Sequence, residues 1–198
     1  MRNQTARLLA AIFLLATSSA AYAHPGHVVS GLAAGLMHPF SGFDHLLAMV
    51  AVGLWAAQGN TKKRGGRKVW LLPATFMITL AVGAGVAMLW QSLHMVEAGL
   101  AVSVLALGLL VTLSMQLPVL LSVAITALFG LLHGYAHGLE LPESAAPAAY
   151  AFGFLAATAS LHISGIAVVV AARKHYVLLS RFAGSSIAIS GAYLLASG

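Results

Sequence analysis

HPFSGFDH, residues 38–45, interrupts a stretch of the chain that otherwise has the composition of a membrane span. Ionisable side chains are costly to place in hydrocarbon, by roughly 2.5–3.5 kcal/mol each on insertion scales. Three of them, His38, Asp44 and His45, fall within two helical turns, beside the helix breaker Pro39. Imidazole and carboxylate together suit a borderline divalent metal ion. The stretch therefore predicts a polar metal site inside a membrane protein.

The composition of the whole chain agrees with a membrane protein. Of its 198 residues, 60% are apolar and 7% are charged, which is typical of transmembrane helices and excludes a soluble domain. The lack of cysteine excludes disulfides and thiolate metal sites. The net charge of +6 is carried mainly by residues between apolar segments, so we expect the lipid bilayer, and no nucleic acid, as partner.

Residues 1–23 have the pattern of a cleavable secretory signal peptide. Arg2 and Arg7 precede a short apolar run, and AYA at residues 21–23 has the small-x-small form of a cleavage site. An uncleaved anchor helix is the alternative. The connections that follow are short, so we expect a single domain over residues 24–198.

Six apolar segments follow, each near the ~20 residues that a span of the bilayer requires. They predict an all-α membrane protein built as a six-transmembrane-helix bundle. The first is long, which fits a break at Pro39. The segments are 28–57, 69–90, 96–115, 118–138, 146–172 and 176–196.

Basic residues predict the orientation of the bundle. Five of them lie in residues 62–68, Arg173 and Lys174 lie in the fifth connection, and Arg181 follows. With six spans these connections fall on one side, which the positive-inside rule makes cytoplasmic. We therefore expect a multi-pass protein of the bacterial cytoplasmic (inner) membrane, with both termini periplasmic. The sequence leaves open whether it forms a homo-oligomer.

A second cluster, HGYAHGLE at residues 133–140, lies in the fourth segment. His133, His137 and Glu140 share one helix face, and histidines four residues apart can chelate a metal ion. Gly130, Gly134 and Gly138 form an adjacent stripe that allows another helix to approach closely. That helix is expected to be the first segment, which would bring His38 opposite His133. Alternatively, the glycines serve only to pack helices together, and the histidines only form interhelical hydrogen bonds.

The two clusters resemble each other. GLMHPF at residues 35–40 aligns with GLLHGY at residues 130–135, and an acid follows each. Because the two segments run in opposite directions, we hypothesise that residues 28–115 and 118–196 are inverted three-helix repeats with the site at their interface.

Three further histidines are candidate ligands. His162 in the fifth segment is a candidate extra ligand or relay, or else a satisfied core histidine. Cleavage after Ala23 would make His24 the mature N-terminus, whose amine and imidazole, with His27, would form an outer capture site. The alternative for His24 and His27 is a stretch of chain that merely suits the signal peptidase.

The sequence resembles the HupE/UreJ family, hydrogenase and urease accessory membrane proteins described as nickel permeases. The family pattern His-Pro-x-x-Gly-x-Asp-His is met by residues 38–45. The later pattern, aromatic-His-Gly-x-x-x-Gly-x-Glu, is met by residues 133–140, with Leu132 in place of the aromatic residue. The resemblance implies import of Ni²⁺, or Co²⁺, to supply metalloenzymes. The ion would be the transported substrate, with no permanently bound cofactor.

We therefore expect a secondary transporter or facilitator and not an enzyme. No phosphate-binding Gly-x-x-x-x-Gly-Lys-Ser/Thr run is present in the sequence. Two alternatives use the same ligands. One is an intramembrane metal-dependent hydrolase with His38, His133 and His137 as ligands and Glu140 as base. The other is a b-type haem protein with axial histidines from facing spans.

Overall fold

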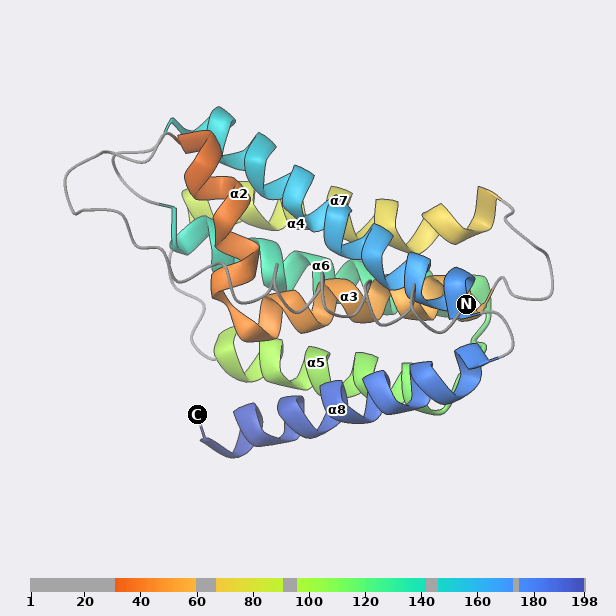
Figure 1. Ribbon diagram of the computed structural model, residues 1–198. Helices are drawn as coiled ribbons and strands as arrows, with labels where there is room; N and C mark the ends of the chain where they lie inside the picture. The colour runs from red at the N-terminus through yellow and green to blue at the C-terminus, as the bar shows by residue number, and fades with distance from the viewer. Residues whose placement is uncertain (1–30, 60–66, 91–95, 142–145, 173–174, 198) are drawn as a thin grey trace, which may run out of the picture.

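A computed structural model of the protein describes residues 31–59, 67–90, 96–141, 146–172 and 175–197 (Figure 1). Within these ranges the chain is helical and contains no strand. The predicted signal peptide, His24, His27 and most of the basic residues lie outside them. The elements are α2 (Gly31–Ser41), α3 (Phe43–Gln58), the short 3₁₀ helix η2 (Arg67–Trp70), α4 (Leu71–Leu89), α5 (Val96–Thr112), α6 (Val119–Leu139), α7 (Pro147–Ala172) and α8 (Tyr176–Ser197).

Several of these helices are long and apolar enough to cross a bilayer. Four qualify alone, namely α4, α6, α7 and α8, and the bent pair of α2 and α3 qualifies as a fifth when taken together. Helix α5 is apolar but has 17 residues, which is short against the ~20 that a span requires. The all-helical fold with several candidate spans is confirmed, and six spans remain a prediction.

The first apolar segment breaks at Gly42, so the prediction of a break at Pro39 is wrong. Pro39 lies inside α2, which continues to Ser41, and α3 leaves α2 at 82°. Pro39 removes only the hydrogen bond to the carbonyl of residue 35 and leaves the rest of the helix intact. Gly42 is extended, with φ −93° and ψ 112°, and a Cβ there would overlap the His45 ring. The turn therefore falls where no side chain fits beside His45.

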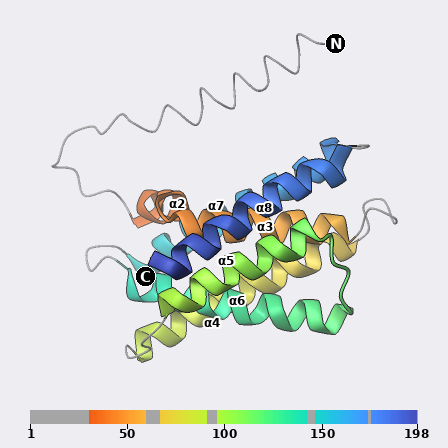
Figure 2. The ribbon, with the colours of Figure 1, turned by 90° about the horizontal axis from the view of Figure 1, so that it is seen from below.

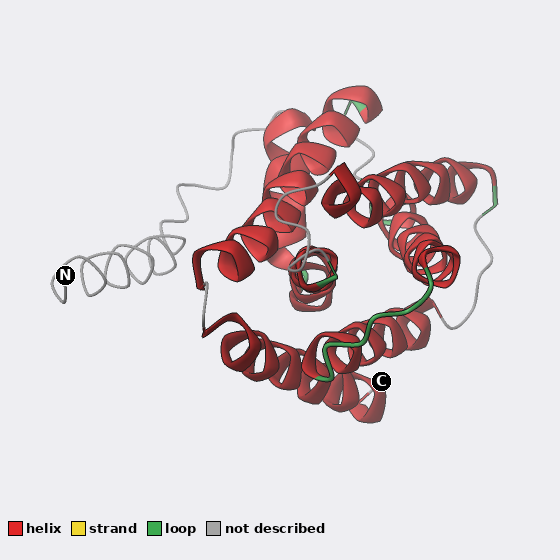
Figure 3. Cartoon of the chain, turned by 90° about the vertical axis from the view of Figure 1, so that its right-hand side faces the viewer, coloured by secondary structure: helices red, strands yellow, loops and turns green. Residues whose placement is uncertain are grey.

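Helix α3 is the centre of the bundle. Every residue from Ala51 to Gln58 is buried, and α3 contacts α4, α5, α7 and α8. The other long helices expose many apolar side chains on their outer faces, such as Ile78, Phe152 and Ile189. This pattern is the one expected of a bundle whose periphery faces lipid. Figure 3 shows the bundle seen nearly along its helix axes.

Glycines bring the helices into backbone contact in pairs. A Cβ on Gly134 of α6 would overlap the Leu80 carbonyl of α4, and a Cβ on Gly53 of α3 would overlap the His162 carbonyl of α7. The glycine stripe of α6 thus packs on α4. The prediction that it admits the first segment is wrong, because the approach of α4 uses that face (Figure 2).

The helix pairing has a symmetry that bears on the repeat hypothesis. Helices α3, α5 and α7 run in one direction and α4, α6 and α8 in the other (Figure 1). The principal pairs are α4 with α6, α5 with α8, and α7 with α2 and α3. The hypothesis equates the first segment with α6, α4 with α7, and α5 with α8. If each helix is replaced by its counterpart, the same three pairs result, as inverted repeats require. The repeat itself remains a hypothesis.

Candidate metal centre

A cluster of imidazoles and carboxylates lies at one end of the bundle, where α2 meets the C-terminal end of α6. His38 Nε2 is 2.9 Å from Glu140 Oε2, and His137 Nδ1 is 3.5 Å from the same oxygen. The ligand atoms of these three residues all lie within 4.8 Å of one another. Two ligands about 2.1 Å from one metal ion are at most about 4.2 Å apart, so a small contraction would let all three bind.

His45 extends this cluster into the bundle. Its ring centroid lies 3.9 Å from that of His137 and 5.2 Å from that of His133. Asp44 lies at the start of α3, where its Oδ1 accepts a hydrogen bond of 2.9 Å from the His45 backbone N–H and is 3.8 Å from His45 Nε2. Both predicted motifs thus meet at one place, where His137 of the second motif contacts both histidines of the first.

The predicted pairing of His38 with His133 is wrong. His38 contacts His137, with ring centroids 4.8 Å apart, and His45 is the residue that faces His133. The reason is the relative direction of the two helices. Because α3 and α6 run oppositely, the early residue of the first motif meets the late residues of the second.

Burial increases along the cluster. The Glu140 side chain is 52% exposed and that of His38 is 22% exposed, whereas His133 is fully buried. The pKa of the Glu140 carboxyl lies well below its usual range, first because of the His137 imidazole and then because of His38. An ionised carboxylate at the exposed end and neutral ligands deeper in the bundle would suit the capture of a cation.

Backbone carbonyls fix the ring orientation of the two deepest histidines. His133 Nδ1–H donates to the Phe129 carbonyl at 2.9 Å, and His162 Nδ1–H donates to the Met49 carbonyl at 2.7 Å. Each Nε2 then carries a lone pair, and neither has a hydrogen-bond partner among the described residues. A buried polar atom without a partner costs about 1–3 kcal/mol. Metal-binding histidines are oriented in this way, by donating their other ring N–H to a carbonyl.

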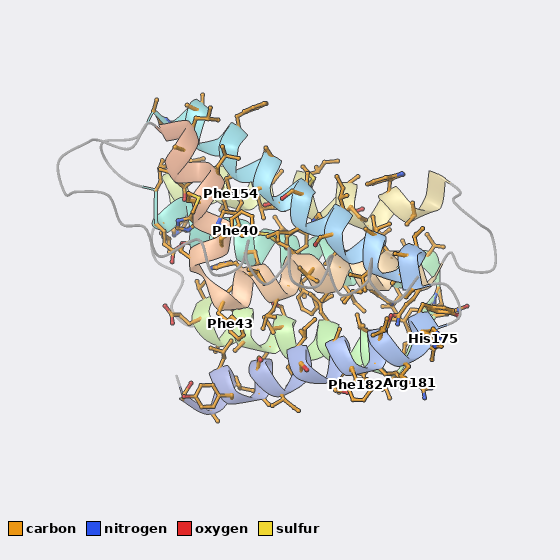
Figure 4. The ribbon with its side chains drawn as sticks, viewed as in Figure 1. Phe40, Phe43, Phe154, His175, Arg181 and Phe182 are labelled. Atoms are coloured by element: carbon orange, nitrogen blue, oxygen red, sulfur yellow. The ribbon has the colours of Figure 1, made fainter. Side chains whose placement is uncertain are left out.

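Aromatic side chains that the sequence patterns did not single out surround the cluster. Phe154, which is labelled in Figure 4, packs on His137 with ring centroids 4.1 Å apart. Tyr150 packs on His38 with ring centroids 5.7 Å apart. Both lie on α7, four residues apart, and Thr158 and His162 continue the same spacing along one face of the helix. This four-residue spacing in the sequence could have indicated the two aromatic residues. His162 itself contacts Phe76 of α4.

A family model described as HupE / UreJ protein matches residues 12–194. The chain belongs to the HupE/UreJ family. One relative is Protein HupE of Rhizobium leguminosarum bv. viciae, which is 42% identical over 182 residues, or 91% of this chain and 93% of the relative. No solved structure matches the chain. The family predicted from the two His-containing patterns is thus confirmed.

Proposed function

We propose that this HupE/UreJ family member is a secondary transporter or facilitator that imports Ni²⁺, or Co²⁺, across the cytoplasmic membrane. The imported ion would supply metalloenzymes such as hydrogenase or urease. The observation that carries the proposal is the convergence of His38, His137 and Glu140 within 4.8 Å, continuous with the buried rings of His45 and His133. Imidazole and carboxylate are suitable ligands for both ions.

The order of the ligands supports transport over a static site. An entering ion would meet Glu140 and His38, which are partly exposed, and then His137, His45 and His133, which are buried. Successive rings lie 3.9–5.2 Å apart, so an ion can be handed on without losing all of its ligands at once. A conducting site must bind strongly enough to admit the ion and weakly enough to release it. A series of incomplete ligand sets meets that requirement.

The proposed direction is inward from the end that holds Glu140. The end of α3, the start of α4, the end of α7 and the start of α8, which flank the basic connections, lie at the opposite end of the bundle (Figure 1). The positive-inside rule would make that end cytoplasmic. The cluster would then face the periplasm, with six spans crossing the inner membrane.

Uptake of ⁶³Ni²⁺ tests the proposal. Cells that produce the protein should accumulate ⁶³Ni²⁺ faster than cells without it, and excess Co²⁺ should reduce the rate if both ions share the site. Proteoliposomes with the purified chain should show the same flux. Protein that binds Ni²⁺ but passes none in either system would contradict transport and favour the hydrolase alternative.

A further inference from the structure

Phe76 of α4 contacts two of the buried histidines. Its side chain is 0% exposed. Its ring centroid lies 5.5 Å from that of His133 on α6 and 5.3 Å from that of His162 on α7. In the series of ring contacts that runs from His38 through His137, His45 and His133, Phe76 is therefore the link to His162.

A glycine of the α6 stripe explains how Phe76 reaches this position. A Cβ on Gly130 would lie 2.7 Å from the Phe76 carbonyl oxygen and 3.2 Å from its Cα. Because Gly130 has no side chain, the backbone of α4 at Phe76 lies directly on α6. The phenyl ring can then extend past α6 to the interior face of α7. The glycine spacing noted in the sequence thus positions an aromatic ring among the histidines.

The two histidines that Phe76 contacts have the same hydrogen-bonding state. Both donate Nδ1–H to a carbonyl of an adjacent turn or helix, and both Nε2 atoms are buried with no hydrogen-bond partner in the described part of the chain. Each offers a lone pair to a cation. The phenyl ring offers no comparable ligand and excludes water from the space it fills. Apolar constrictions of this kind block ions by dewetting.

We propose that Phe76 is the gate of the ion path, and that it separates the outer group of ligands, ending at His133, from an inner position at His162. This inference rests on the transport function proposed above and assigns the step that controls it. With Phe76 in the observed position, its ring contacts both histidines, and no ring contact joins His133 directly to His162 among the described residues. A rotation of the phenyl ring, or a movement of α4 together with α6 against α7, would open a route between them.

The chain has no cysteine, so a single introduced thiol can report on the gate without background. The test is the rate at which His162→Cys in the purified full-length protein reacts with a charged, water-soluble thiosulfonate reagent, followed by mass spectrometry. A buried thiol is inert, and a thiol that water reaches is reactive. His162→Cys alone should react slowly, and His162→Cys with Phe76→Ala should react about tenfold faster or more. His38→Cys, at a partly exposed position, is the positive control.

A matched control removes the same volume elsewhere. Phe129→Ala empties an equal space in α6, at a residue that is 8% exposed, and should leave the His162→Cys rate low. Phe76→Val should give an intermediate rate and replaces Phe76→Ala if that variant is not monodisperse. Fast labelling with Phe76 intact, an unchanged rate without it, or equal acceleration by Phe129→Ala would each overturn the proposal.

The labelling result does not depend on nickel transport. If the wild-type protein carries no Ni²⁺, the transport function fails while the thiol rates still decide whether Phe76 closes off position 162. If it does carry Ni²⁺, Phe76→Ala proteoliposomes should pass the ion faster than wild type. A slower or equal rate from folded Phe76→Ala protein would contradict the gate.

Discussion

The imidazole of His38 and the carboxylate of Glu140 meet at 2.9 Å, although 102 positions separate them in the chain. The contact joins the end of α2 to the end of α6, and thus the first motif to the second. It also lies at the partly exposed end of the cluster, where an ion would first lose water. The pair should therefore act as a unit in metal binding.

Loss of either partner should weaken Ni²⁺ binding, and the two losses should not add. We expect His38→Ala and Glu140→Gln each to raise the Kd, and the double variant to deviate from additivity by about 0.5–3 kcal/mol, as contacting residues do. Isothermal titration of the purified proteins measures this. Glu97→Gln, which removes an exposed acid of α5, should bind as wild type does. Strict additivity would show that the two side chains act separately.

His133 should be indispensable to uptake. Its buried Nε2 has no hydrogen-bond partner among the described residues, and His45, the preceding ligand on the proposed path, contacts its ring. We expect His133→Ala to insert normally in the membrane and to lose ⁶³Ni²⁺ uptake. His175→Ala removes a histidine at the far end of the bundle (Figure 4) and should leave uptake intact. Normal transport by His133→Ala would refute the role given to this residue.

Uptake should fall in acid because protons compete with the metal for imidazole. Ligation requires the neutral ring, so we expect the rate to decline as the external pH is lowered. Glu140 does not contribute to this decline. Its lowered pKa keeps it ionised until the pH falls well below 4.5, so its interactions are lost only in stronger acid. A rate that stays constant at every pH at which the protein remains folded would contradict histidine ligation.

Two glycines of α4 should respond oppositely to alanine. A Cβ on Gly83 would overlap the Leu131 carbonyl of α6, whereas a Cβ on Gly85 meets nothing within 4 Å. We expect Gly83→Ala to cost about 1–3 kcal/mol or more, because backbone cannot move aside cheaply. Gly85→Ala should be neutral or stabilise by up to about 1 kcal/mol. Thermal unfolding monitored by size-exclusion chromatography compares them. Equal stabilities would mean that α4 and α6 are not in backbone contact.

The sequence predicted the helices well because their signal is local. Each of the six apolar segments contains helix over most of its length, and the two His-containing patterns come together as expected. The position of the bend was not predictable from Pro39 alone, since proline is tolerated inside α2. It depends on Gly42, whose need for a missing Cβ comes from His45 packing beside it.

The pairing of residues between helices was harder to predict from the sequence. A stripe of glycines indicates close approach but does not name the helix that approaches, which is α4 and not the first segment. The contact of His38 with His137 followed from helix direction, which was known, and from register, which was not. Phe76 could not be identified as a site residue from the sequence, because nothing distinguishes it from the other apolar residues of its span.

Backbone contact between helices has a consequence for motion. Where Gly53 and Gly165 interlock α3 with α7, and Gly83 and Gly134 interlock α4 with α6, no side chain lies between the two main chains to rearrange. Each couple is consequently stiff, and cannot open internally without breaking apart. Any switch from one open face to the other must come from one couple sliding or tilting against the next, along the line where His45 of α3 faces the imidazoles of α6.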